Sequence, residues 1–336
     1  MSLDRIRLAS LHDKVISAEE ASAFIEDGMT VGMSGFTRAG EAKAVPLALV
    51  KRAHTNPLKI TLITGASLGN DLDKQLTEAG VLARRLPFQV DNTLRKAINN
   101  GEVMFIDQHL SETVEQMRNL QLKKPDVAII EAVAITEDGG IIPTTSVGNS
   151  ASFAIFAEKV IVEINTNLSP AFEGLHDIYI PTYRPTRQPI PLTQVDERIG
   201  THAINIDPAK IVGIVINNDL HDSPSTVTAP DDETQGIADH LIAFFEKEVA
   251  EERLPKNLGP LQAGIGSIAN AVLTGLKDSN FEDLVMYSEV LQDCTFELID
   301  AGKMKFASGS SITLSAKYGE KVFNNLEAYK DKLVLR

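Results

Sequence analysis

The sequence predicts an α/β protein made of two open domains with mostly parallel sheets, and three observations support this fold class. Apolar strand patterns alternate with helix patterns along the chain, which is typical of βαβ units. Aromatic residues make up only 5% of the chain and Trp is absent, so the core consists mainly of Ala, Val, Ile and Leu. Such a core fits α/β layers better than a β-sandwich. A length of 336 residues favours two domains.

The first half of the chain follows this alternation. Ser17-Ala-Glu-Glu20 has the spacing of a capping box and starts a helix that we expect to end at Gly28. The next predicted elements are a strand over Thr30–Met33, a helix over Val45–His54, a strand over Lys59–Ile63, a helix over Asp71–Ala79, a strand over Val103–Ile106, a helix over Glu112–Leu120, a strand over Val127–Glu131, a hairpin turn at Glu137–Gly140, a helix after Ser150 and a strand over Val160–Asn165.

Residues 166–198 interrupt the alternation, since they contain five prolines and few periodic apolar positions. We expect a surface excursion or lid-like segment there. The pattern then resumes with a strand over Lys210–Ile216, a helix over Pro230–Glu252, a turn after Leu261, a helix to Leu276, a strand at 284–288, a helix near Phe296–Ala301, a strand at 304–307, a helix over Ala316–Tyr329 and a strand-like end at Leu333–Arg336. We place the first domain at residues 1–228 and the second at 229–336.

Composition excludes several classes of function. The chain has 32 Lys and Arg against 46 Asp and Glu, a formal charge of -14, which disfavours a nucleic-acid partner. Its single cysteine, Cys294, excludes an intrachain disulfide framework, and the histidines show no zinc spacing, so we expect no metal site. No apolar run has membrane-spanning length and residues 1–13 lack a signal-peptide core, which predicts a cytoplasmic protein without a membrane partner.

Glu289 is the most informative single residue. It lies near the end of Leu284-Val-Met-Tyr-Ser-Glu-Val-Leu-Gln-Asp293, an apolar run of strand length. A strand buried on both faces rarely holds an acid unless that acid is paired or has a chemical role. We therefore predict a nucleophilic carboxylate that attacks a thioester or similar carbonyl, and whose desolvation sharpens its nucleophilicity. The alternative is a strand-end acid that faces solvent or pairs with a cation.

A glycine turn leads into a helix at Gly264-Ile-Gly-Ser-Ile-Ala-Asn270. Glycines allow the backbone to approach a ligand closely, and a helix N-terminus offers free N–H donors. The third glycine of a dinucleotide fingerprint is missing, so we do not predict a Rossmann site. An ordinary strand-to-helix turn is the alternative, and proximity to Glu289 in the sequence favours the ligand site.

Two further loops follow strands, Ser34–Gly40 and Thr64–Ser67. In an open α/β sheet such loops meet at the carboxyl ends of the strands, where ligands bind. Arg38 could hold a carboxylate substrate or simply be solvated.

Other polar residues carry weaker signals. The acidic residues Glu131, Glu137 and Asp138 have no histidine nearby, which argues against a metal cluster. We expect His176, which precedes Asp177, to lie at the surface. Cys294 is expected to be a buried or half-buried unreactive thiol.

Taken together, these motifs resemble the acetyl-CoA hydrolase/transferase family within the class I CoA-transferases. The resemblance runs along nearly the whole chain. It is carried by Ser34–Phe36, Leu62–Ser67, Ile135–Gly140, Ser146–Ser150, Glu173–Asp177, Gly264–Val272 and Tyr287–Asp293.

The resemblance implies two α/β domains of the CoA-transferase type and assigns roles to the motifs. Glu289 would form a glutamyl-CoA thioester. The loop made of Gly264, Ile265, Gly266, Ser267 and Ile268 would bind CoA and help to stabilise the oxyanion. CoA would pass between an acyl-CoA, such as acetyl-CoA or succinyl-CoA, and a short carboxylate such as acetate, with hydrolysis when water is the acceptor. CoA is then a substrate and covalent intermediate, no permanent cofactor is implied, and a homodimer is expected.

Two departures from the family pattern matter. Ser267 stands where similar chains often have Asn. Chains of the family also continue past Leu333–Arg336, so we expect the second domain to be incomplete and to require a C-terminal fragment with a further glycine motif.

Two other functions stay open at this stage. One is a non-catalytic ligand-binding or assembly subunit on the same fold. The other is an enzyme like a sugar-phosphate isomerase, which would need basic residues near the loops, where Arg38 and Lys43 are the candidates.

Overall fold

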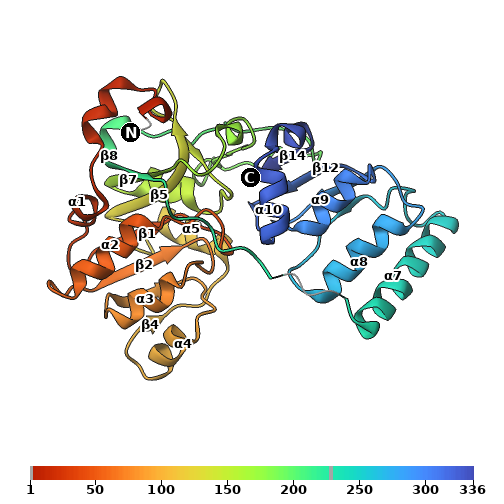
Figure 1. Ribbon diagram of the computed structural model, residues 1–336, viewed down its shortest axis with the longest axis horizontal. Coiled ribbons are helices and arrows are strands. Elements are labelled where there is room, and N and C mark those ends of the chain that lie inside the picture. The colour runs from red at the N-terminus through yellow and green to blue at the C-terminus, as the bar shows by residue number, and fades with distance from the viewer. Residues whose placement is uncertain (1–2, 227–229) are drawn as a thin grey trace. The chain divides into compact units, whose positions relative to one another are not determined.

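The computed structural model describes residues 3–226 and 230–336, which form two compact units (Figure 1). Unit 1 extends to Pro189 and continues from Gly200 to Ser223, whereas unit 2 contains Ile190–Ile199 and the described residues from Pro224 to Arg336. The predicted boundary between residues 228 and 229 lies outside the described residues, and the assignment of a domain to each side of it stays a prediction.

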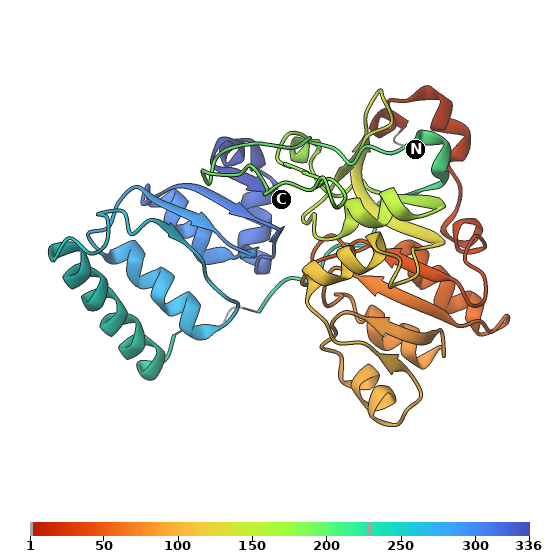
Figure 2. The same cartoon turned by 180° about the vertical axis from the view of Figure 1, so that it is seen from behind.

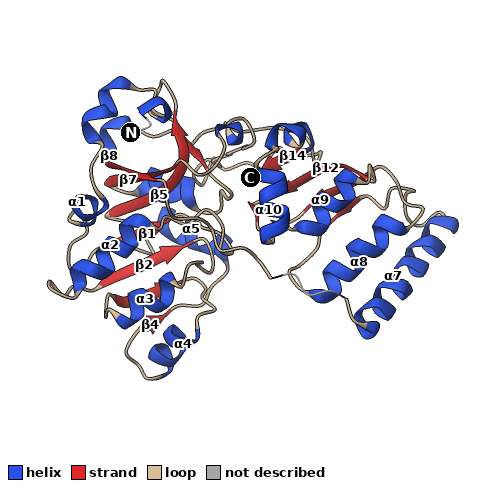
Figure 3. Ribbon diagram, in the orientation of Figure 1, coloured by secondary structure: helices blue, strands red, loops and turns tan. Residues whose placement is uncertain are grey.

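An eight-stranded sheet forms the centre of unit 1, with the strand order β4-β3-β2-β1-β5-β7-β8 and with β6 paired to β5. The strands are β1 (Thr30–Met33), β2 (Ile60–Thr64), β3 (Leu82–Leu86), β4 (Met104–Phe105), β5 (Val127–Ile135), β6 (Ile141–Pro143), β7 (Lys159–Asn165) and β8 (Ile211–Asn217). Only the β5–β6 pairing is antiparallel, as the predicted hairpin requires, and every other pairing is parallel (Figure 3). The predicted α/β class with a mostly parallel sheet is confirmed.

Helices cover both faces of this sheet. They are α1 (Ala18–Ser22), α2 (Ala44–Ala53), α3 (Leu72–Glu78), α4 (Asn92–Asn99), α5 (Leu110–Arg118) and α6 (Ser150–Phe156). Figure 1 shows α2 and α3 on one face, and Figure 2 shows the opposite face. Val31 and Met33 of β1 pack in the core cluster that includes Leu49 of α2. Gly32, between them, faces α6, where a Cβ would lie only 2.8 Å from the Phe153 ring. Only glycine allows α6 to pack this closely on β1.

Strand β3 and helix α4 were not predicted from the sequence. Two adjacent arginines interrupt the apolar pattern of β3, and Arg85 is nevertheless fully buried. Its Nε lies 2.8 Å from Asp73 Oδ1, and its guanidinium also donates to Ala66 O at 3.3 Å. Because its charge and N–H groups are satisfied inside the unit, a charged residue can occupy a core position of the strand.

The N-terminal helix is shorter than predicted. The capping box is present, since Ser17 Oγ accepts from Glu20 N and the Glu20 carboxylate accepts from Ser17 N. Helix α1 ends at Ser22, however, and i→i+3 hydrogen bonds from Ala23 to Ile25 tighten the following turn.

Residues 166–198 are only partly the surface excursion that we expected. A 3₁₀ turn at Pro170–Phe172 buries Phe172 and Leu175 in unit 1. Further on, the segment Ile190–Ile199 packs in unit 2, where the Arg336 guanidinium donates to Val195 O at 3.0 Å. Between these parts the chain is mostly exposed.

Unit 2 has a four-stranded parallel sheet in the order β14-β12-β10-β9 and a parallel β11–β13 pair. Its strands are β9 (Pro260–Leu261), β10 (Leu284–Tyr287), β11 (Val290–Leu291), β12 (Met304–Gly309), β13 (Ser311–Ile312) and β14 (Leu333–Leu335). Its helices are α7 (Asp232–Ala250), α8 (Ser267–Asp278), α9 (Asp293–Asp300) and α10 (Ala316–Phe323).

Helix α10 also ends earlier than predicted. The chain continues past Phe323 in two 3₁₀ turns, and Tyr329 lies between them. The Tyr329 hydroxyl donates to Asp300 at 2.9 Å, and its ring packs edge-on against Phe296 with centroids 5.4 Å apart. These contacts hold the segment against α9 without a regular helix. Among the residues that the structure describes, no helix is both long and apolar enough to cross a bilayer.

Candidate active site

The loops after β1 and β2 meet at the carboxyl ends of these strands, as predicted. Arg38 N donates to Ser67 O at 3.1 Å. A Cβ on Gly65 would lie 2.3 Å from Gly35 O, so the two backbones approach closely. The sheet order also changes direction between β1 and β5, which is the place where open α/β sheets form ligand crevices.

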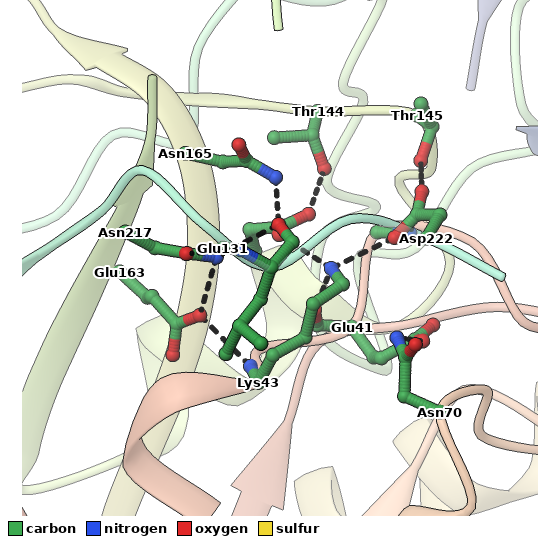
Figure 4. Close-up of polar contacts among 12 residues, drawn as sticks. Glu41, Lys43, Asn70, Glu131, Thr144, Thr145, Glu163, Asn165, Asn217 and Asp222 are labelled. Atoms are coloured by element: carbon green, nitrogen blue, oxygen red, sulfur yellow. Dashed lines mark hydrogen bonds and ion pairs between the residues drawn. The ribbon is translucent and has the colours of Figure 1, made fainter. Parts of the chain in front are cut away.

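A buried polar network surrounds Lys43 at this switch point (Figure 4). Lys43 Nζ lies 2.6 Å from Glu131 Oε1 on β5 and 2.7 Å from Asp222 Oδ1, and it donates to Glu41 O at 2.7 Å. Glu163 on β7 accepts from the backbone N–H groups of Lys43, Ala44 and Val45 and so caps helix α2. Side-chain hydrogen bonds from Thr144, Asn165 and Asn217 complete the network.

Burial and neighbouring charges together shift the pKa values of this network. Burial, reinforced by repulsion from Asp222, raises the pKa of Glu41 to about 8. Burial also raises the pKa of Glu131 to about 7, although Lys43 opposes the shift. Burial alone would lower the pKa of the Lys43 ammonium, but attraction to Asp222, Glu131 and Glu41 outweighs it and holds that pKa well above its ordinary value.

This network corrects two expectations. Glu131, Glu137 and Asp138, which look like one acidic cluster in the sequence, do not form one, because Glu131 is buried on Lys43 whereas Glu137 is exposed and pairs with Arg7 at 3.0 Å. The Lys43 ammonium forms buried ion pairs and is not available to bind a substrate phosphate. This argues against the isomerase-like function. Arg38 is exposed and lines a small pocket of about 250 Å³ together with Asn70, Asp71 and Asp91.

His176 was expected at the surface, and this expectation is wrong. The residue is 1% exposed and its ring stacks on Phe172. A ring nitrogen lies 2.9 Å from Thr144 O, so a polar contact compensates for burial. The adjacent Asp177 is also buried, and its carboxylate accepts from Gly200 N at 2.6 Å.

In unit 2, Glu289 lies in the connection between β10 and β11. Its backbone is fixed, because its carbonyl accepts from Ser310 N at 2.8 Å. The backbone of the preceding residue is fixed in the same way, because Ser288 N donates to Ser308 O at 2.8 Å. The side chain itself takes part in none of the hydrogen bonds or ion pairs found among residues 3–226 and 230–336.

The structure corrects the environment predicted for Glu289. The side chain is exposed rather than buried, and the strand before it alternates, with Leu284 and Met286 buried and Tyr287 exposed. Strand β10 is therefore covered fully on one face only within the described residues. Glu289 was singled out as an acid on a strand buried on both faces, and this reason was wrong. Its position beside a glycine turn agrees with the sequence analysis.

The predicted glycine loop lies beside Glu289. Gly264, Ile265 and Gly266 are exposed, and helix α8 starts at Ser267 with Gly266 as its N-cap. Within the described part of the chain, no atom lies within 4 Å of a Cβ built on Gly264 or Gly266, although the positive φ of Gly266 (145°) still favours glycine there. Ile268 is half exposed at 49%. The first turn of α8 has no side-chain cap, so its N–H groups are available to a ligand.

Two residues that sequence reasoning missed, one on each side of Glu289 in the sequence, fasten this loop to the segment that holds Glu289. Ser288 Oγ donates to Ala263 O at 3.0 Å and accepts from Ala263 N at 3.3 Å. Gln292 Nε2 donates to Gly264 O at 3.2 Å. Both side chains are buried, and their positions next to Glu289 were the only sequence signal.

Cys294 is buried, as expected. Burial is the main reason that the pKa of its thiol is raised to about 12. The neutral thiol is therefore the form present near neutral pH, which argues against a nucleophilic role for it.

Comparison with known proteins identifies the family. A sequence profile of the acetyl-CoA hydrolase/transferase N-terminal domain matches residues 2–216. A succinyl-CoA:acetate CoA-transferase of Clostridium kluyveri is 44% identical over 99% of this chain and 62% of its own length. An acetyl-CoA hydrolase of Saccharomyces cerevisiae is 40% identical over 99% of this chain and 65% of its own length. The chain thus spans less than two thirds of the length of these relatives.

Solved structures agree on the fold. RipA from Yersinia pestis superposes with a TM-score of 0.69 at 17% identity, covering 94% of this chain and 68% of that protein. A 4-hydroxybutyrate CoA-transferase from Porphyromonas gingivalis gives a TM-score of 0.64 at 17% identity, covering 98% of this chain and 68% of that protein. At such identity these likenesses concern the fold alone. The profile match and the relatives with 40% and 44% identity over nearly the whole chain show that this chain belongs to the acetyl-CoA hydrolase/transferase family.

Proposed function

We propose that this chain transfers CoA between an acyl-CoA, such as acetyl-CoA or succinyl-CoA, and a short carboxylate such as acetate. Glu289 is the nucleophile and carries a glutamyl-CoA thioester during the cycle. Water as the acceptor gives acyl-CoA hydrolysis. The names of the curated relatives, a CoA-transferase and an acetyl-CoA hydrolase, support both outcomes.

One observation carries the proposal. The Glu289 backbone is fixed by hydrogen bonds to neighbouring strands, whereas its carboxylate is exposed and forms no hydrogen bond or ion pair with any residue that the structure describes. A carboxylate that is placed firmly but left without a partner is suited to attack an external carbonyl.

The glycine loop supports the same site. Open space around Gly264 and Gly266 leaves room for a ligand, and the N–H groups at the start of α8 favour negative charge. Ile265 is 61% exposed and Tyr287 is 47% exposed, so apolar surface also flanks the carboxylate. Exposed apolar side chains beside N–H donors match a ligand with an alkyl chain and an anionic oxygen.

The chemistry then follows from these groups. A Glu289 oxygen attacks the thioester carbonyl carbon, and the carbonyl oxygen gains negative charge, which backbone N–H donors in the loop stabilise. Breaking the C–S bond releases CoA thiolate and leaves a mixed anhydride on Glu289. The thiolate attacks the glutamyl carbonyl of the anhydride, which releases the first carboxylic acid as its carboxylate and forms the enzyme–CoA thioester. An acceptor carboxylate reverses these steps.

Replacement of Glu289 tests the proposal. Glu289→Ala should abolish CoA transfer from acetyl-CoA or succinyl-CoA to acetate or succinate, and Glu289→Asp should nearly abolish it, because the shorter side chain withdraws the nucleophile. Glu282→Gln, at an exposed glutamate before β10, is the matched control and should keep full activity. Normal turnover in Glu289→Ala would exclude Glu289 as the nucleophile. A wild-type chain that binds acyl-CoA without turning it over would instead support a non-catalytic subunit on the same fold.

The cellular setting belongs to the same proposal. We expect a cytoplasmic homodimer that takes acyl-CoA and short carboxylates as its small-molecule partners and needs no permanent cofactor. The acidic balance of the chain supports the absence of a nucleic-acid partner.

A further inference from the structure

Gln292 occupies the N-cap position of helix α9 but does not cap that helix. Residues at this position usually accept a hydrogen bond from the first turn of their own helix. The Gln292 amide instead reaches back 28 residues and donates to Gly264 O at 3.2 Å. The side chain is only 8% exposed, so this hydrogen bond forms inside unit 2. The Gln292 amide therefore hydrogen-bonds to the glycine loop rather than to the first turn of its own helix.

Holding Gly264 O also orients the next N–H group. Gly264 C=O and Ile265 N–H belong to one planar peptide, and this peptide is trans. In a trans peptide the N–H points away from the C=O. A hydrogen bond to the carbonyl from the buried Gln292 therefore turns Ile265 N–H away from Gln292. This N–H donates to no acceptor among the hydrogen bonds of the described residues.

The loop needs such a restraint because it can easily change conformation. Gly264 has no protein atom within 4 Å of its Cβ position, and Gly266 has a φ of 145°. Rotation of the 264–265 peptide changes ψ of Gly264 and φ of Ile265, and on the Gly264 side no Cβ restricts it. Ser288 fixes Ala263 through two hydrogen bonds, but these end one residue before that peptide. Only Gln292, among the described contacts, acts on the peptide itself.

We propose that Gln292 is a positioning residue that aims the Ile265 N–H at the oxyanion formed when Glu289 attacks a thioester. The inference rests on the proposed function and adds a residue that does not touch the reacting atoms. Glu289 and Gln292 are three residues apart, so one connection between β10 and α9 supplies the nucleophile and sets the direction of the donor. In the reaction step, the bond between the Glu289 oxygen and the thioester carbonyl carbon forms, the C=O π electrons move to the carbonyl oxygen, and Ile265 N–H donates to that oxygen. The electrons then re-form the C=O as the C–S bond breaks, so that CoA leaves as thiolate and the mixed anhydride stays on Glu289.

Nuclear magnetic resonance tests the orientation without turnover. In protein labelled with ¹⁵N-isoleucine, the Ile265 amide peak is assigned by its disappearance in Ile265→Val. Gln292→Ala should shift and broaden this peak as the peptide samples two orientations. Gln262→Ala, at an exposed glutamine near the same loop, is the matched control and should leave the peak unchanged. An Ile265 peak unchanged in Gln292→Ala would overturn the inference whether or not the protein turns over.

Kinetics test the consequence. Loss of one oxyanion donor costs about 10²–10³ in kcat, so partial misorientation in Gln292→Ala should lower kcat by about 10- to 100-fold. KM for the acyl-CoA should change by less than about twofold, because the donor acts mainly in the transition state. A loss confined to KM would contradict the inference.

The nearly isosteric Gln292→Glu variant separates orientation from packing. An ionised carboxylate repels Gly264 O, whereas a protonated one donates to it again. The ratio of Gln292→Glu to wild-type activity should therefore rise as the pH falls towards about 5. A ratio independent of pH would contradict the inference. If Glu289→Ala is inactive while Gln292→Ala and Gln292→Glu keep full activity, the inference about Gln292 is wrong and the proposed function stands. If Glu289→Ala is active, the proposed function fails.

Discussion

Lys43 Nζ lies 2.6 Å from Glu131 Oε1, and both side chains are almost completely excluded from solvent. The same ammonium contacts Asp222 at 2.7 Å, shortly before the chain leaves unit 1. One lysine thus ties the loop after β1, the central strand β5 and the end of unit 1 together. Because water cannot replace these contacts, the loss of either charge should be costly.

Lys43→Met is predicted to lower the free energy of unfolding by about 3–5 kcal/mol, since it leaves buried carboxylates without a counter-charge. Denaturant titration measures this loss. Lys123→Met removes an exposed lysine paired with Asp126 and should cost no more than about 1 kcal/mol. Equal effects of the two replacements would show that the Lys43 network contributes little to stability.

The stability of unit 1 should depend on pH through Glu41. Burial raises the pKa of Glu41 to about 8, whereas its ordinary pKa of 4.5 applies to the unfolded chain. Folding therefore favours the protonated carboxyl, and this contribution is fully present below about pH 4.5 and is lost as the pH rises through about 8. Stability should fall between these limits and level off above them.

Glu41→Gln tests this pH dependence, because the amide keeps an acceptor for Asn70 Nδ2 but cannot ionise. The difference in unfolding free energy between about pH 6 and about pH 8.5 should shrink in this variant. Glu112→Gln changes an exposed carboxylate and should leave the difference as in the wild type. If the unfolding free energy of Glu41→Gln keeps the pH dependence of the wild type, groups other than Glu41 cause that dependence.

Gly264→Ala should fold normally and still lose activity. A Cβ there meets no protein atom within 4 Å, so any clash must come from a bound ligand. We expect a rise in KM for acyl-CoA with an unchanged midpoint of thermal unfolding. Gly236→Ala on α7 also meets no protein atom, and it should keep activity and stabilise the helix by about 1 kcal/mol. Unchanged kinetics in Gly264→Ala would exclude close approach of a ligand to this loop.

The thiol of Cys294 should be unreactive in the folded protein. Burial raises its pKa to about 12, so little thiolate is present at pH 8. A chromogenic thiol reagent should label no cysteine in native protein and one per chain in denaturant, because the sequence has a single cysteine. Rapid labelling of native protein would mean that unit 2 opens around α9.

The fold was largely predictable because parallel βαβ units leave a local pattern in the sequence. Strand β3 escaped prediction since Arg85 is satisfied by Asp73, a partner on another element. The ion pairs of Lys43 could not be foreseen either, because they join residues at least 88 positions apart in the sequence. Glu289 was found beside its glycine turn, but its exposure depends on what covers β10, which no local pattern reports.

The central claim, that Glu289 carries CoA, is tested most directly by chemical trapping. The protein is incubated with acetyl-CoA or succinyl-CoA and treated with borohydride, which reduces a glutamyl thioester to an alcohol, and its peptides are then mapped by mass spectrometry. The account predicts an alcohol at Glu289 that depends on acyl-CoA, and an unmodified Glu282 in the same digest. An unmodified Glu289 in folded protein that turns over acyl-CoA would contradict it.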